Sequence, residues 1–191
     1  MDYAKWVCAI FCAGLLPAGE TMHVAICNPG HFSDATVRGA EAETGAIFQH
    51  AGVDVVWAKC GSGPVSEQAA IGHWFTIRLR GDKAVAGEPG LASPAIMGRA
   101  FVSGGQPGYL ADVYVEAVRA FSAQTGANDR AAIGCVMAHE LGHLLLGPGH
   151  EEEGIMRAPW SRTDAAAITQ RWLRFNWAEN ARIRQALDAE G

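Results

Sequence analysis

A chain of 191 residues with 49% hydrophobic and 18% charged residues can form one medium-sized domain with a substantial core, and this composition excludes bulk disorder. Its 20 acidic and 15 basic residues give a net charge of −5 at pH 7, which argues against a nucleic-acid-binding protein because such proteins carry a basic surface. The 23 glycines follow no fixed period, which excludes collagen-like and repeat architectures.

The first 19 residues have the pattern of a secretory signal peptide. Lys5 is their only basic residue, Trp6–Leu16 is an uninterrupted apolar stretch, and the small residues Pro-Ala-Gly end it at positions 17–19. A buried first helix and an uncleaved signal anchor are the alternatives. We therefore predict a signal peptide over residues 1–19 and a folded domain over residues 20–191. The protein is then secreted or periplasmic and has no membrane span once the signal is removed.

The folded domain is predicted to begin with a strand, a helix and a second strand. Residues 21–28 form an apolar run that ends at Pro-Gly, Ser33 can cap a helix that continues to about Ala51, and residues 53–60 are β-branched and almost continuously apolar. Because this order of elements forms a βαβ unit, we expect the two strands to be parallel neighbours.

More strands and helices are predicted downstream of this unit. The strict apolar and polar alternation from His73 indicates a strand with one wetter face, and Asn176 with Glu179 resembles a capping box. The expected elements are strands over residues 73–80, 95–103 (an edge strand) and 109–114, and helices over residues 115–125, 128–146 and 176–189.

Three of the five cysteines lie after the predicted signal peptide, at positions 27, 60 and 135. They contain no C-x-x-C pair, so a zinc site made of cysteines is not expected. In an exported chain Cys27 and Cys60, which end two predicted strands, can form a disulfide. Whether they pair depends on a Cα separation that the sequence does not give.

The segment that carries chemistry reads HELGHLLLGPGH over residues 139–150. His139 and His143 are four residues apart, so on a helix they project from one face and can bind one zinc ion. Glu140 can lie beside that ion without ligating it, where it can accept a proton from a zinc-bound water. This pattern is the H-E-x-x-H metallopeptidase motif. The alternative is a pair of ordinary helix histidines beside a solvated turn.

A catalytic zinc ion usually has three protein ligands and one open position. We predict His150 as the third ligand, because Gly147 and Gly149 allow the chain to reverse after the helix. The glutamates at residues 151–153 are rival ligands, and a solvated acidic turn is their alternative role. Cys135, one turn before the first histidine, is a further candidate, although a third helical turn lies far along the axis.

With these residues the chain resembles the metzincin clan of zinc metallopeptidases, whose motif H-E-x-x-H-x-x-G-x-x-H precedes a methionine-containing Met-turn. His139, Glu140 and His143 match the motif. Gly147 and His150 also match, but each lies one residue later than in the family. The resemblance is specific over residues 139–157 and extends, less specifically, to about residues 21–190.

The resemblance also includes a candidate Met-turn. Residues 154–159 read GIMRAP, and Met156 would be the methionine of the turn; core packing is the alternative role for this side chain. In the family this turn runs beneath the metal and supports the histidines. Some metzincins add a tyrosine ligand two residues after the methionine, but here that position is Ala158.

The metzincin resemblance implies an α+β fold. It would be a zincin catalytic domain with a mixed, mostly parallel twisted sheet, an antiparallel edge strand, a zinc-binding helix and a C-terminal helix. It also implies one zinc ion (Zn²⁺) held by His139, His143 and His150. The implied activity is that of a zinc endopeptidase in which Glu140 is the general base.

A peptide or protein substrate follows from the same resemblance. Residues 95–103 would bind it in extended form, and Arg157, Pro159 and Trp160 would line the pocket just beyond the scissile bond. Trp160 can equally be a core residue. We expect a monomer with no nucleic-acid partner. Two other functions remain: a zinc-stabilised binding domain without catalysis, and a zinc amidohydrolase with a non-peptide substrate.

Overall fold

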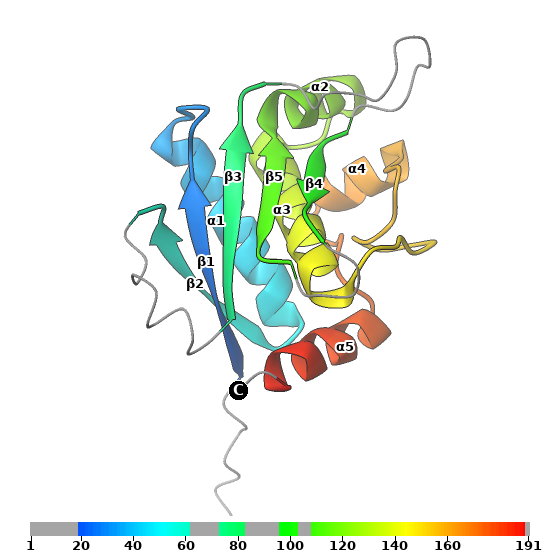
Figure 1. Ribbon diagram of the computed structural model, residues 1–191. Coiled ribbons are helices and arrows are strands. Elements are labelled where there is room, and N and C mark those ends of the chain that lie inside the picture. The colour runs from blue at the N-terminus through cyan, green and yellow to red at the C-terminus, as the bar shows by residue number, and fades with distance from the viewer. Residues whose placement is uncertain (1–18, 62–72, 83–95, 103–107, 190–191) are drawn as a thin grey trace, which may run out of the picture.

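The computed structural model describes residues 19–61, 73–82, 96–102 and 108–189, and this part of the chain forms a sheet with helices packed against it (Figure 1). The strands are β1 (Glu20–Cys27), β2 (Val53–Lys59), β3 (His73–Arg80), β4 (Gly98–Ala100) and β5 (Leu110–Tyr114). The helices are α1 (Asp34–His50), α2 (Val115–Thr125), α3 (Asp129–Leu146), α4 (Arg162–Thr169) and α5 (Trp177–Asp188). The signal peptide predicted for residues 1–19 lies outside the described residues, apart from Gly19.

The five strands form one mostly parallel sheet in the order β2-β1-β3-β5-β4. Strand β1 pairs in parallel with both β2 and β3, and β3 pairs in parallel with β5. Strand β4 pairs antiparallel with β5 and is the outer strand on that side. The predicted βαβ unit and the predicted mixed sheet with an antiparallel edge strand are therefore confirmed.

The edge strand is shorter than predicted. Ladder pairing covers only Gly98–Ala100, and of the predicted range 95–103 the two end residues lie outside the described part of the chain. The limit comes from its partner, because β5 has five residues and passes into α2 at Val115 without a linker. Single hydrogen bonds continue the contact on both sides of the ladder, from Tyr114 N–H to the Met97 carbonyl and from Phe101 N–H to the Leu110 carbonyl.

The core lies between the sheet and helices α1 and α3, which run side by side behind it (Figure 1). Alternate residues of β1 and β3 supply its sheet side, as the predicted alternation requires: Met22, Val24, Ile26, Phe75, Ile77 and Leu79. The helices meet closely at Gly134, where an added Cβ would lie 2.7 Å from the Ala40 carbonyl oxygen. The Thr44 hydroxyl lies 2.9 Å from the carbonyl oxygens of both Ala40 and Gly134 and so links the two helices.

Helix α3 is the central element of the fold. Every residue from Ala131 to Leu144 is buried, which is the pattern of a helix that other elements surround on all sides. Its start is fixed by Asn128, whose side chain accepts a hydrogen bond from Ala131 N–H. Its end is at Gly147, as predicted, where φ is +89°. Within the described residues no helix is both long and apolar enough to cross a membrane.

Helix α4 is an element that sequence analysis does not predict. It begins at a capping box in which the Ser161 side chain accepts from Asp164 N–H and the Asp164 carboxylate accepts from Ser161 N–H. The S-x-x-D pattern of residues 161–164 is the signal that could have identified it. The corresponding capping box at Asn176 and Glu179, which starts α5, is confirmed.

Cys27 and Cys60 form a disulfide, with their Cα atoms 4.7 Å apart. Parallel pairing of β1 with β2 places the ends of both strands together and so brings the two cysteines within reach. The bond joins positions 33 residues apart, a span for which loop-closure entropy predicts about 3–4 kcal/mol of stabilisation. Cys135 is free and buried in α3.

Candidate metal centre

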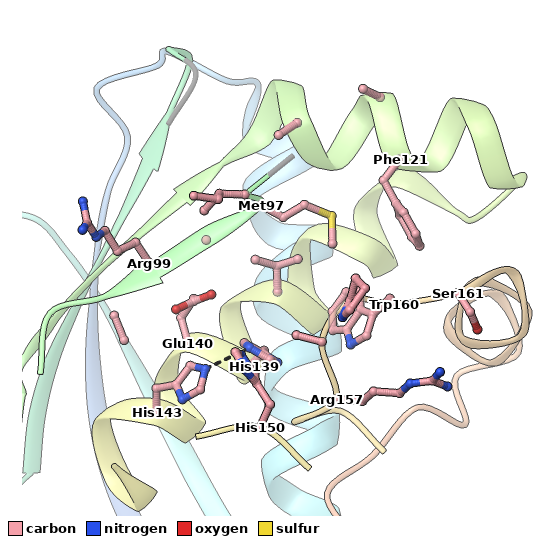
Figure 2. Close-up of a pocket in the computed structure, with 18 of the residues that line it drawn as sticks. Met97, Arg99, Phe121, His139, Glu140, His143, His150, Arg157, Trp160 and Ser161 are labelled. Carbon is pink, nitrogen blue, oxygen red and sulfur yellow. Dashed lines mark hydrogen bonds between the residues drawn. The ribbon is translucent and has the colours of Figure 1, made fainter. Parts of the chain in front are cut away.

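The candidate centre is built on the C-terminal half of α3. His139 and His143 lie one turn apart on one face of this helix, and both imidazoles are buried. Their Nε2 atoms are 3.0 Å apart, and their rings are nearly perpendicular, with an interplanar angle of 84°. The Nε2 atoms of the two rings therefore point toward the same position, as Figure 2 shows.

His150 reaches this point from the segment that follows the helix. Its ring centroid lies 5.3 Å from that of His139 and 5.0 Å from that of His143. The chain reverses through Gly147 and Gly149, whose φ angles of +89° and +140° are readily adopted only by glycine. The extra residue before Gly147, relative to the metzincin motif, is thus accommodated by the turn.

Hydrogen bonds to backbone carbonyls orient both helix histidines. Nδ1 of His139 lies 2.7 Å from the Ile155 carbonyl oxygen, and Nδ1 of His143 lies 3.2 Å from the Gly147 carbonyl oxygen. Each Nδ1 must carry the proton to donate to a carbonyl, so each Nε2 of the neutral ring presents a lone pair. Two lone pairs that face each other at 3.0 Å repel unless a cation lies between them.

Burial keeps these rings neutral. It lowers the pKa of His139 to about 4, against a smaller rise from the hydrogen bond to Ile155. Burial also lowers the pKa of His143. Neutral imidazole is the form that binds metal ions, so both rings are in their ligating form at neutral pH.

The three histidines together fit a zinc ion. Their candidate ligand atoms all lie within 4.8 Å of one another. Among the described residues, these three histidines are the group whose side chains could together hold a metal ion. Three imidazole nitrogens suit zinc and leave a fourth position open. The rival ligands lie elsewhere. Cys135 is buried beside Glu43, and burial raises the pKa of its thiol. Glu151 faces Arg182, with 4.0 Å between their charged atoms. Glu152 and Glu153 are exposed, as a solvated acidic turn requires.

Glu140 lies beside the histidines and beneath the edge strand. Its carboxylate is buried, and burial raises its pKa to about 8, while a hydrogen bond from the backbone of Ala100 acts in the opposite direction. A divalent cation beside this carboxylate would lower that pKa. Strand β4 approaches Glu140 so closely at Gly98 that an added Cβ there would overlap the carboxylate and could be accommodated only if that side chain moved.

Met156 packs beneath the histidine-bearing turn of α3. It is buried, and an added Cβ at Gly142 would lie 2.5 Å from its sulfur atom. The turn that carries it is held by the hydrogen bond from Ile155 N–H to the Arg174 carbonyl and by a bridge between Glu151 and Arg157. The same turn supplies the Ile155 carbonyl that orients His139. Met156 is therefore a core residue that packs against α3 between the two helix histidines.

A cleft of about 840 Å³ opens over the candidate centre. Arg157, Pro159 and Trp160, the predicted pocket residues, all line it. Trp160 also packs against the core, and its Nε1 donates to the Ile155 carbonyl, 3.3 Å away, that His139 shares. Trp160 therefore lines the cleft and packs against the core at once, and its contact with a substrate stays a prediction.

Met97 and Gly98 line the cleft and lie within residues 95–103, the predicted substrate-binding strand, although neither was singled out from the sequence. Phe121 of α2 was not identified from the sequence as a cleft residue. A glycine inside a predicted strand is a sign of close backbone approach, so Gly98 carried a weak signal. Nothing in the sequence connects α2 with the cleft, because that contact depends on how α2 turns away from the end of β5.

Comparison with known proteins gives a fold relationship only. No protein-family model matches the sequence, and no curated protein is significantly similar to it. Among solved structures, archaemetzincin from Methanopyrus kandleri matches with a TM-score of 0.54 and 17% sequence identity, over 91% of this chain and 99% of that chain. The chain has an archaemetzincin-like fold. At this level of identity the likeness concerns the fold and not the activity.

Replacing His150 tests the ligand set. We expect the full-length His150→Ala protein to bind zinc at least about 100-fold more weakly, a larger loss than removal of an outer-shell partner causes. The matched control is His50→Ala, which removes an exposed histidine at the end of α1. Competition with a chromophoric chelator measures both affinities. Equal affinity in the two variants would contradict the assignment of His150.

Proposed function

We propose that this protein is a zinc-dependent endopeptidase of the metzincin type. The observation that carries the proposal is the placement of Glu140, a buried carboxylate that lies beside three converging imidazoles without belonging to their cluster. A purely structural zinc site is closed by a fourth ligand and has no use for such a group. The archaemetzincin-like fold and the cleft over the site support the same function.

His139, His143 and His150 would hold the zinc ion, which would supply Lewis-acid activation of water and of the scissile carbonyl. The role of Glu140 is proton transfer. Its carboxylate accepts a proton from the attacking water and then delivers it to the nitrogen of the leaving amine. The carbonyls of Ile155 and Gly147 keep the two helix histidines in their ligating orientation throughout.

The edge strand is the proposed binding site for the peptide backbone. Because β4 is the outer strand of the sheet over the described residues, one of its edges is available to pair with an extended chain. Glu140 lies against Gly98 and Ala100, so a peptide paired with the free edge of this strand passes close to the carboxylate. This placement brings a scissile bond next to the candidate metal ligands.

Residues 154–159 serve in this proposal as the Met-turn. Met156 supports the helix between the two histidines at Gly142, and Ile155 orients His139. We further propose that the protein acts as a monomer outside the cytosol, secreted or periplasmic. The disulfide between Cys27 and Cys60 supports this location, since such bonds persist in oxidising compartments.

Cleavage of a degenerate peptide library by the zinc-loaded full chain tests the proposed function. We expect cuts by the wild-type protein, and we expect Glu140→Gln to reduce kcat/KM by at least about 100-fold, the scale of general acid–base catalysis. Zinc content should be one per chain in both proteins, because Glu140 is not in the ligand cluster. Mass spectrometry of the products and of the intact proteins gives both results.

The other outcomes separate the competing functions. One bound zinc ion without any Glu140-dependent cleavage of peptides would contradict the endopeptidase and favour a binding domain. Glu140-dependent hydrolysis of small amides but not of peptides would favour an amidohydrolase. Loss of zinc in the Glu140→Gln protein would contradict the proposal that Glu140 acts as the base without binding the metal.

Gly98→Ala tests how the edge strand positions Glu140. The new methyl group would collide with the carboxylate, so we expect Glu140 to be displaced and peptide hydrolysis to fall by about tenfold or more while zinc affinity is kept. Gly45→Ala is the control, because its added Cβ meets nothing closer than 3.9 Å. A Gly98→Ala protein with wild-type kcat/KM would contradict this role of the strand.

A further inference from the structure

A buried carboxylate on helix α1 has no part in the proposed reaction. Glu43 is 1% exposed and lies where α1 meets α3, since an added Cβ at Gly134 would lie 2.6 Å from the Cβ of Glu43. A carboxylate in such a place costs free energy unless cations and hydrogen-bond donors compensate for the loss of water. The partners of Glu43 therefore indicate what this side chain does in the molecule.

Two arginines from the segment between α4 and α5 supply this compensation. Nη1 of Arg174 donates to Oε1 of Glu43, 3.2 Å away, and Nε of Arg171 lies 3.4 Å from Oε2. The side chain of Arg174 is 19% exposed, whereas that of Arg171 is 69% exposed, so water and salt screen the second pair far more than the first. The pair of Glu43 with Arg174 is therefore the stronger link between α1 and this segment.

The backbone of Arg174 contacts the turn that orients the metal centre. Its carbonyl oxygen accepts a hydrogen bond from Ile155 N–H at 3.0 Å. The carbonyl oxygen of Ile155 in turn accepts from Nδ1 of His139 and from Nε1 of Trp160. Arg174 thus joins Glu43, through its side chain, to the residue that fixes the ring of His139, through its backbone.

The guanidinium of Arg174 also fixes the peptide unit that precedes this residue. The same Nη1 that binds Glu43 donates to the carbonyl oxygen of Leu173 at 2.9 Å. The carbonyls of residues 173 and 174 therefore have different partners, the guanidinium and Ile155 N–H. Because Glu43 holds the guanidinium in place, it also holds the orientation of the backbone that Ile155 contacts.

Apolar packing secures the same segment in a different way. Leu173 and Phe175, on either side of Arg174, are each 4% exposed, and the ring of Phe175 packs against that of Phe48 with centroids 5.2 Å apart. Burial of apolar surface is non-directional, so it sets how deeply the segment lies. A charge-assisted hydrogen bond has a defined geometry, and it sets the direction of the polar groups.

We propose that Glu43 is a positioning residue for the metal centre. Through Arg174 it fixes Ile155, whose carbonyl keeps the proton of His139 on Nδ1 and leaves Nε2 directed at the other two histidines. The inference rests on the zinc centre of the proposed function and adds to it a residue of α1, outside the zinc-binding motif. It does not depend on the nature of the substrate.

Zinc affinity of Glu43→Gln tests the proposal. We expect zinc to bind about tenfold more weakly, the lower end of the loss that outer-shell partners of metal ligands cause. The matched control is Asp112→Asn, which neutralises a carboxylate that is 4% exposed and is bound by Nε and Nη2 of Arg78 on the neighbouring strand β3. We expect wild-type affinity in this control. Competition with a chromophoric chelator measures both proteins.

The double variant Glu43→Met/Arg174→Met separates positioning from stability. It replaces the pair with apolar side chains and leaves neither of the two charges unpaired, so the free energy of unfolding should be maintained or increased. Zinc affinity should still fall about tenfold, because the directed contact with the backbone of residues 173 and 174 is lost. Wild-type zinc affinity in a stable double variant would show that the pair serves only the fold, and would overturn the inference.

Nuclear magnetic resonance of the metal-free chain gives a readout without zinc or cleavage. We expect the Ile155 amide to exchange with solvent about tenfold faster in Glu43→Gln, and the indole N–H signal of Trp160 to shift, because both report on this turn. Neither should change in Asp112→Asn. Unchanged Ile155 exchange in Glu43→Gln, or unchanged zinc affinity, would overturn the inference. Failure of the wild-type chain to bind zinc would instead contradict the proposed function.

Discussion

The centre depends on the hydrogen bond from Nδ1 of His139 to the carbonyl oxygen of Ile155. This bond joins the central helix α3 to the turn at residues 154–157, and Trp160 donates to the same oxygen. It fixes the tautomer of His139, so that Nε2 faces the Nε2 of His143 at 3.0 Å. Without it, the orientation of His139 toward the other two histidines would not be fixed.

Close packing around α3 makes this arrangement possible. Glycines at positions 134 and 142 admit α1 on one side and Met156 on the other. An added Cβ at Gly134 would collide with the backbone of Ala40, and one at Gly142 would displace the Met156 side chain. Burial also keeps His139 neutral, and burial beneath β4 raises the pKa of Glu140 to about 8. The elements that stabilise the fold therefore also prepare the side chains of the site.

The parts of the molecule that could be predicted from the sequence are those marked by a local residue pattern. The H-E-x-x-H spacing places His139, Glu140 and His143 on one helix, and the alternation from His73 identifies β3 with its buried face. Asn128, Asn176 and the two glycines after α3 mark element ends that the structure confirms.

The features that sequence reasoning missed depend on contacts between distant segments. The length of β4 is limited by β5, and the close contact of Gly98 with Glu140 joins residues that are far apart in the chain. Helix α4 was missed although Ser161 and Asp164 carry a capping signal, because its eight residues are too few to show a clear period. The cleft-lining face of α2 has no local signature, because its alanines are equally typical of any exposed helix.

The most direct test of the central claim is X-ray absorption spectroscopy at the zinc edge on the metal-loaded full chain. We expect three imidazole nitrogens at about 2.0–2.1 Å and one oxygen ligand, with no sulfur in the coordination shell. The spectrum of His150→Ala should lose one imidazole. A sulfur ligand at about 2.3 Å, or an unchanged shell in that variant, would contradict the assignment of His139, His143 and His150 as the zinc ligands.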